Sequence, residues 1–206
     1  ARSNCDHVLV IVHGGHEHYH YPSPETLKRY RFYADSGASA VIAHHTHCIG
    51  GYERYNDVPI FYSLGNFFFP TDIKMPPFWH EGYALLLKIA KKSLEFDILP
   101  YEQCKNGDLS IDRIRGNEIL AKIEGINRVL NDDEQLAAYW KKFTKNRTDY
   151  YLSMMSGIGR YKIAIFRRLG LLGLFYRKPQ LEFLRQMIRC EAHKEVAHQV
   201  LSNYLK

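Results

Sequence analysis

The sequence predicts an α/β fold followed by a helical C-terminal region, and three observations support this prediction. Short apolar runs rich in β-branched residues are separated by glycine, proline and asparagine turns up to residue 111. The first two runs flank a helical segment, which is the order of a βαβ unit. From residue 117 onward the apolar residues follow the helical period. We therefore expect an α/β unit over 1–112 and a basic helical region over 113–206.

The predicted βαβ unit consists of three segments near the start of the chain. The run HVLVIV at 7–12 predicts a short buried strand that ends at a glycine pair. A serine, a proline and an acid then mark a helix start, so we expect a helix over Pro24–Ser36. A second strand is expected at 40–43. Because carboxyl ends of neighbouring parallel strands meet at one sheet edge, the residues that follow them should lie together.

The remaining segments change from strands to helices along the chain. Hairpins are predicted over 51–62 and 83–101, separated by a proline-containing loop at 64–82. An asparagine and three acidic residues predict the start of a helix over 131–146. A last helix begins at Pro179, where apolar residues recur about every 3.6 positions. We find no internal repeat.

Charge is divided unevenly between the two parts of the chain. Lys and Arg number 7 against 8 Asp and Glu up to residue 90, and 21 against 14 after it. A basic region of this kind could face nucleic acid, anionic lipid or a phosphorylated polymer. No nucleic-acid reading motif accompanies the charge, so specific nucleic-acid binding is not expected. No apolar run is long enough to predict a transmembrane helix.

Cysteine usage excludes two classes of small domain. The four cysteines are far apart and form no CxxC pair. This spacing argues against a zinc knuckle and against a dense disulfide framework, although one or two disulfides stay open.

Histidine is concentrated in the first part of the chain. Nine of the eleven histidines lie at or before His80, and they form clusters at 13–18 and 44–47. Imidazole binds Zn, Mn, Fe or Ni when a strand end points it into a cleft. The two clusters are separated by one βαβ step, and together they predict a metal site. The alternative is that they are solvated polar turns or an adventitious metal site.

These residues resemble a known family. The segments VIVHGGHEHYHYPSP at 10–24 and SGASAVIAHHTHCIGGYERYNDVPIFYSLGNFFF at 36–69 are similar to the core of the CapA proteins. These proteins serve bacterial capsule and poly-γ-glutamate synthesis and belong to the metallo-dependent, calcineurin-like phosphoesterase superfamily. The family pattern is approximately HWGxE, GADxVIGHHPH, an ExY hairpin and YSLGNF. This chain departs from it at Gly14, Ala43 and Thr46, and none of these departures removes an expected ligand.

The resemblance implies a fold and a metal centre. Residues 1–112 would be the C-terminal half of a four-layer αββα metallophosphoesterase-like sandwich with two divalent ions, Mn, Fe, Zn or Mg. His13 and His45 would bind one ion and His47 the other. Glu17 would be an acid that either supports a metal ligand or contacts substrate, and Asn66 would be a loop residue at the rim. On the residues alone, a solvated carboxylate and a turn former explain Glu17 and Asn66 equally well.

The resemblance also implies that ligands are missing. The superfamily takes its aspartates, another histidine and an asparagine from motifs before the lone histidine, but only twelve residues precede His13. We therefore expect an N-terminally truncated chain that is inactive alone. The intact protein would be a metal-dependent hydrolase or transferase acting on a phosphorylated or amide-linked polymer precursor. The alternative is a non-catalytic scaffold or anionic-polymer-binding module of the capsule machinery.

Two C-terminal segments have competing interpretations. Six Lys or Arg are mixed with apolar residues over 158–178, a pattern typical of a segment on an anionic membrane surface. The alternative is a helix that packs its apolar residues onto the sandwich while Arg167 and Arg168 face water. The motif over 190–193 resembles a ligand cluster, but its spacing is that of an ordinary packed helix.

Overall fold

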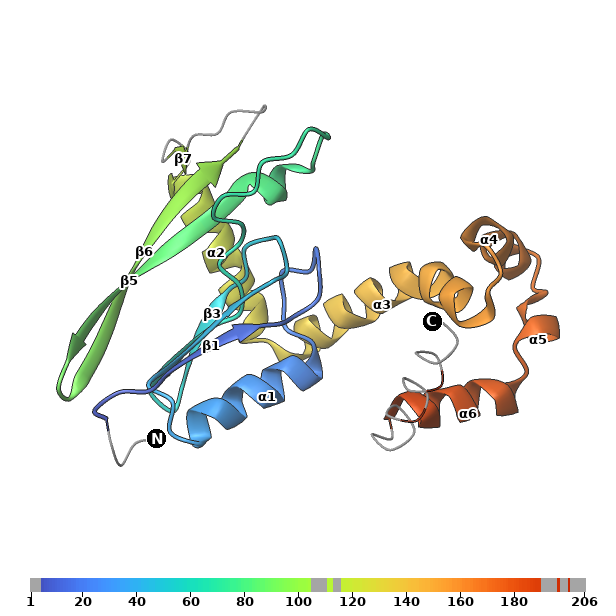
Figure 1. Cartoon of the computed structure of the whole chain (residues 1–206), viewed down its shortest axis with the longest axis horizontal. Helices are drawn as coiled ribbons and strands as arrows, with labels where there is room; N and C mark the ends of the chain where they lie inside the picture. Colours follow the sequence, from blue (N-terminus) through green and yellow to red (C-terminus); the bar gives the residue numbers. More distant parts are fainter. Residues whose placement is uncertain (1–4, 105–110, 113–115, 190–195, 197–199, 201–206) are drawn as a thin grey trace. The chain divides into compact units, whose positions relative to one another are not determined.

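The computed structural model describes residues 5–104, 111–112, 116–189, 196 and 200. Figure 1 shows the chain. Its contacts divide it into a first unit, Ala1–Phe143, and a second unit, Thr144–Lys206. This division falls after the expected boundary at 112, because helix α2 (Gly116–Leu130) packs against strands β3 and β6 of the first unit.

The first sheet contains the predicted βαβ unit. Its four strands are β1 (Leu9–His13), β2 (Ala40–His44), β3 (Tyr52–Tyr55) and β4 (Val58–Phe61), in the order β1-β2-β4-β3. Helix α1 (Pro24–Asp35) joins the parallel strands β1 and β2. Strand β4 is also parallel to β2, and β3 pairs with β4 as an antiparallel hairpin.

The second sheet consists of antiparallel strands. A short 3-10 helix, η1 (Pro77–His80), precedes β5 (Glu81–Ala90), which pairs with β6 (Ser93–Gln103) and then β7 (Ile111–Asp112). Both predicted hairpins are therefore present. The α/β fold class is confirmed, whereas the metallophosphoesterase sandwich stays a prediction.

Helix α1 begins where its sequence signals place it. The Ser23 side chain accepts a hydrogen bond from the Thr26 backbone N–H, and Pro24 occupies the first turn, where no N–H is needed. The helix ends before Ser36 and is followed by Gly37, whose φ of 102° few other residues tolerate.

The prediction that the first strand is buried is wrong. Ile11 is 70% exposed and Leu9 is 38% exposed, while Val10 and Val12 pack toward the core. Exposure alternates along β1 because successive side chains of a strand point to opposite faces of the sheet. Within the described part of the first unit, only one face of β1 is covered.

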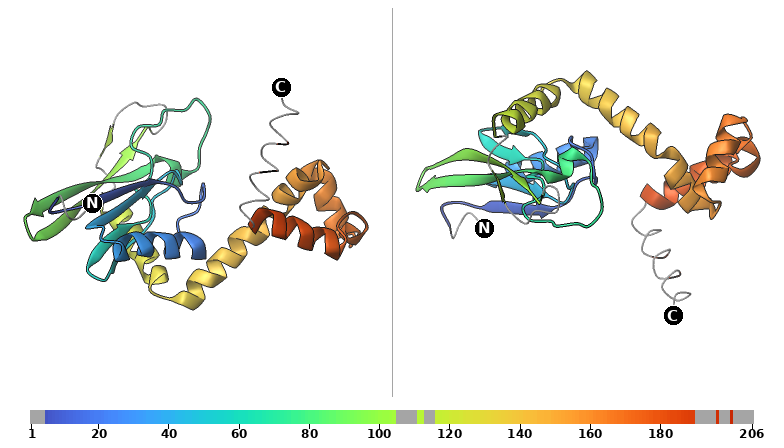
Figure 2. Two further views of the ribbon diagram at one scale, coloured as in Figure 1. Left: turned by 60° about the horizontal axis from the view of Figure 1, so that its bottom comes forward. Right: turned by 90° about the horizontal axis from the view of Figure 1, so that it is seen from above.

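The core of the first unit lies between the helices and the sheets. Helix α1 packs against β2 and β4, and Figure 2 shows these elements from two further directions. Ile119 and Ile123 of α2 are fully buried. They join a cluster of large apolar side chains that includes Tyr30, Ile60 and Phe61.

The second unit is helical. Helix α3 (Asp133–Ser156) begins in the first unit and ends in the second, followed by α4 (Arg160–Arg168), α5 (Leu172–Phe175) and α6 (Lys178–Arg189). The predicted helices over 131–146 and from Pro179 correspond to α3 and α6. The 190–193 motif lies outside the described residues. Among the described helices, none is both long enough and apolar enough to cross a bilayer.

We predict that Ile123→Ala lowers the free energy of unfolding of the first unit by about 2–5 kcal/mol, because it leaves a cavity under α2. Denaturant unfolding followed by tryptophan fluorescence measures this change. Leu120→Ala is the matched control, since Leu120 lies on the same helix and is 36% exposed. Equal losses for the two variants would contradict the packing of α2 onto the sheets.

Candidate functional site

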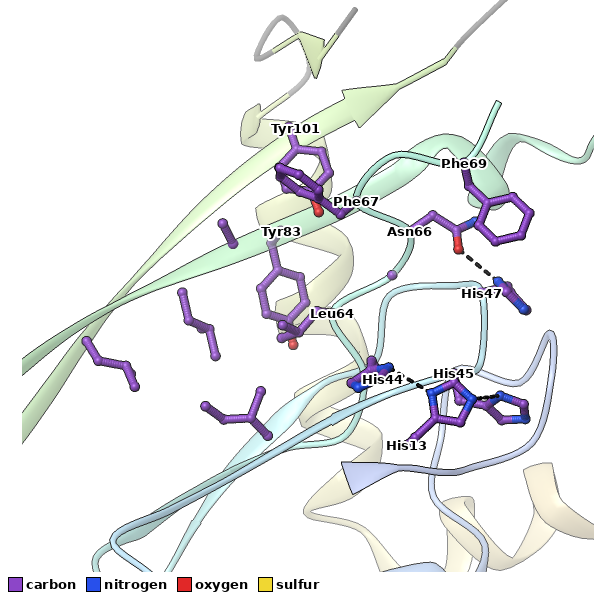
Figure 3. Close-up of a pocket in the computed structure, with 15 residues that line it drawn as sticks. His13, His44, His45, His47, Leu64, Asn66, Phe67, Phe69, Tyr83 and Tyr101 are labelled. Atoms are coloured by element: carbon purple, nitrogen blue, oxygen red, sulfur yellow. Dashed lines mark hydrogen bonds between the residues drawn. The ribbon is translucent and has the colours of Figure 1, made fainter. Parts of the chain in front are cut away.

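A pocket of about 540 Å³ lies in the first unit, beside the carboxyl ends of β1 and β2 (Figure 3). Histidines from the two strand ends form one side of it. Apolar and aromatic side chains from the 64–69 loop and from β5 and β6 form the other. The lining residues that carry polar or aromatic groups are His13, His44, His45, His47, Asn66, Phe67, Phe69, Tyr83 and Tyr101.

Three histidines form a continuous chain at the mouth of this pocket. The Nε2 atom of His13 lies 3.0 Å from Nδ1 of His45, and its Nδ1 lies 3.1 Å from Nδ1 of His44. Both ring nitrogens of His13 therefore face neighbouring imidazoles, as Figure 3 shows. This chain of three histidines forms because His13 is the register partner of His44 in the parallel pairing of β1 with β2.

Backbone contacts hold the two histidine loops together. The Gly14 N–H donates to the His44 carbonyl at 2.9 Å, and the His18 N–H donates to the Thr46 carbonyl at 2.7 Å. His45 has a φ of 122° and His47 a φ of 58°. Such conformations cost about 1–3 kcal/mol each and persist only where surrounding contacts fix them.

Thr46 anchors the second loop in the protein interior. Its side chain is buried, donates to the Cys48 carbonyl at 2.9 Å and lies 2.8 Å from the Ser63 hydroxyl. Burial raises the pKa of the neighbouring Cys48 thiol to about 12. Cys48 and Cys104 are free thiols in the described part of the chain, so no disulfide joins these two.

His47 is held apart from the histidine chain. Its Nδ1 lies 2.8 Å from Oδ1 of Asn66 and donates to it, while the Asn66 amide donates to the Trp79 carbonyl at 2.9 Å. The His47 ring stacks on Trp79 with the ring centroids 4.8 Å apart. The centroid of the His47 ring lies 6.1 Å from that of His45. A proton on Nδ1 leaves the lone pair on Nε2, the form that binds metal ions.

Gly65 sets the position of Asn66. It adopts a φ of +78°, and an added Cβ would lie 2.4 Å from the Glu81 carbonyl oxygen. The loop can therefore approach β5 only with glycine here. Asn66 itself is buried, with 5% of its surface exposed.

The surroundings of His44 and His16 favour the neutral form of these imidazoles. Burial lowers the pKa of His44, and the nearby imidazoles of His13 and His45 lower it further. Burial also lowers the pKa of His16, with a smaller contribution from His45. Neutral imidazole is the form that accepts hydrogen bonds or binds a cation.

The structure brings together most of the residues predicted from the sequence. His13, His45, His47 and Asn66 all line the pocket, whereas Glu17 is exposed and does not line it. The sequence reasoning assigned no role to His44, although it is adjacent to the predicted ligand His45. It also missed the aromatic wall, which the FFF run after Asn66 could have indicated.

The spacing of the His13 and His45 nitrogens can be compared with that of two ligands on one ion. Two nitrogens that share a tetrahedral ion lie about 3.4 Å apart, close to the separation between His13 and His45. Among the residues that the structure describes, however, no group of three or more His, Cys, Asp or Glu side chains has a geometry that could hold an ion. The three predicted imidazoles are suitable donors, but a complete dinuclear centre needs carboxylates in addition.

Comparisons with known proteins agree with the motifs. The family model for bacterial capsule synthesis protein PGA_cap matches residues 1–71. A capsule biosynthesis protein CapA from Bacillus anthracis is 38% identical over 68 residues, which are 33% of this chain and 16% of that protein. A PGA biosynthesis protein CapA from Bacillus subtilis is 39% identical over 69 residues, 34% of this chain and 18% of that protein. The matched segment thus spans less than a fifth of either relative.

We predict that Gly65→Ala lowers the free energy of unfolding of the first unit by more than about 2 kcal/mol, because strained backbone and a clash with the Glu81 carbonyl add together. Thermal and urea unfolding measure this loss. Gly125→Ala is the control, since the nearest atom to its added Cβ is 3.9 Å away. That variant should be neutral or more stable than the parent. Equal stability of both variants would contradict the close approach of the loop to β5.

Proposed function

We propose that this chain works in the synthesis of a bacterial surface polymer of the capsule or poly-γ-glutamate type, because residues 1–71 match the family model for bacterial capsule synthesis protein PGA_cap and resemble two CapA proteins. The two relatives are named for capsule and PGA biosynthesis. Reaction, substrate and partners of the whole protein are part of this proposal.

We propose that the pocket belongs to a metal-dependent hydrolase or transferase that acts on a phosphorylated or amide-linked polymer precursor. The observation that carries this proposal is the meeting of two histidine segments at one pocket. The two ring nitrogens of His13 lie 3.1 Å from Nδ1 of His44 and 3.0 Å from Nδ1 of His45. The apolar wall opposite would exclude water from a bound substrate.

In this proposal His13 and His45 hold one divalent ion and His47 holds a second. Such ions polarise a phosphoryl or carbonyl oxygen and lower the pKa of bound water. Asn66 keeps the proton of His47 on Nδ1 and thereby directs Nε2 toward a cation. A dinuclear centre would need carboxylate ligands in addition to these imidazoles. Glu17, which is exposed, is proposed to contact substrate from outside the pocket lining.

A second candidate function is a non-catalytic scaffold or anionic-polymer-binding module. The observation that favours it is that the imidazoles satisfy one another. Both nitrogens of His13 have imidazole partners, and Nδ1 of His47 has Asn66. A cluster that is hydrogen-bonded in this way is stable without an ion.

We predict that Zn²⁺ shifts the imidazole nitrogen signals of His13 and His45 in a ¹⁵N-correlated NMR titration of the 206-residue chain. His45→Ala should weaken this binding at least about tenfold, because one of two adjacent donors is lost. His7→Ala is the matched control, since His7 precedes β1 at its opposite end and its Nε2 contacts the Ala90 carbonyl. Shifts that are unchanged in His45→Ala would overturn the metal assignment.

The catalytic proposal has a separate test. With Mn²⁺ present, the whole protein should hydrolyse a phosphodiester or a γ-glutamyl amide, and His45→Ala should abolish turnover while His7→Ala retains it. Metal binding without turnover on either substrate would support the scaffold function instead.

A further inference from the structure

The described part of the second unit has very little apolar core. Over 144–189, Ile163 is the one large apolar side chain that is fully buried. Many others lie on the surface, and several are more than half exposed. These are Tyr151, Met154, Tyr161, Ile165, Leu169, Leu174, Phe183 and Ile188. So much exposed apolar surface on a small helical unit indicates an interaction surface.

Helix α6 carries most of its apolar side chains on one side. At the helical period, Leu181, Leu184, Met187 and Ile188 share a broad face, and Phe183 lies at its edge next to Met187. Phe183 is 61% exposed and Ile188 is 51% exposed, and no residue of the helix is buried. The described residues therefore leave Leu181, Phe183 and Ile188 exposed on α6 and cover Leu184 and Met187 only in part.

The basic residues of α6 lie away from the middle of its apolar face, about 130° around the helix. Lys178, Arg185 and Arg189 follow one another at spacings of seven and four, which places them on one stripe. Over 144–189 ten Lys and Arg stand against two acidic residues. One of those acids, Asp149, is already bonded to Arg167 at 2.7 and 2.9 Å. Residues 144–189 thus carry a large net positive charge.

We propose that α6 and the basic second unit bind the surface of an anionic lipid bilayer, with the apolar face of α6 inserted at the headgroup level. A short amphipathic helix with both basic residues and an apolar face has the two features that such binding requires. A twelve-residue helix is about 18 Å long, so it lies on a bilayer and does not cross it.

Lipid explains the surface better than a soluble anionic polymer does. A soluble polymer would neutralise the arginines but leave Phe183 and Ile188 in water. Insertion at the headgroup boundary removes both side chains from water and brings Lys178, Arg185 and Arg189 to the anionic headgroups. This inference rests on α6 and the charge of the second unit, and it is independent of the pocket and its proposed chemistry.

The test is co-sedimentation of the 206-residue chain with vesicles. We expect binding to phosphatidylcholine vesicles containing about 30% phosphatidylglycerol, and at least tenfold weaker binding to pure phosphatidylcholine. Arg185→Gln combined with Arg189→Gln should weaken binding about 25-fold, because each charge contributes about fivefold near the surface. Phe183→Ser combined with Ile188→Ser should weaken it by more than about tenfold.

Phe32→Ser is the matched control, because Phe32 is 63% exposed but lies on α1 of the first unit. It should bind as the parent does, and circular dichroism should show the same helix content in every variant. Equal binding to neutral vesicles would overturn the proposal. So would full binding by Phe183→Ser with Ile188→Ser. Binding to soluble polyglutamate without any vesicle binding would assign the surface to a polymer and likewise overturn it.

Discussion

Parallel pairing of β1 with β2 is the constraint on which the site depends. The register places His13 opposite His44, so the two histidine loops leave the sheet at the same edge. Side chains alternate along a strand, and a slip by one residue would turn the His13 ring to the other face of the sheet. The register of the sheet therefore determines the geometry of the site in the first unit.

The loops then need backbone conformations that strand pairing does not provide. His45 and His47 have positive φ, and Gly65 brings the Asn66 loop against β5. Buried hydrogen bonds of Thr46 and Asn66 hold these conformations in place. This support explains why imidazoles from separate segments meet within hydrogen-bonding distance, and it gives the same residues either of two uses. They can hold a cation, or they can satisfy one another.

Much of this arrangement could be predicted from local sequence signals. The Pro24 helix, the two parallel strands and both hairpins follow from caps, turns and β-branched runs, which act over a few residues. Features that depend on distant parts of the chain were missed. The exposure of Ile11 reflects which elements cover β1, and the contact of α2 with β6 joins segments far apart in the sequence. The role of His44 likewise requires the strand register, which composition does not reveal.

The two units differ in what stabilises them. The first buries large side chains from two helices and two sheets, among them Tyr30, Phe61 and Ile123. The second, in its described part, buries Ile163 while ordering more than forty residues. The proposed binding of α6 to an anionic bilayer would remove from water apolar side chains that the described part of the second unit leaves exposed.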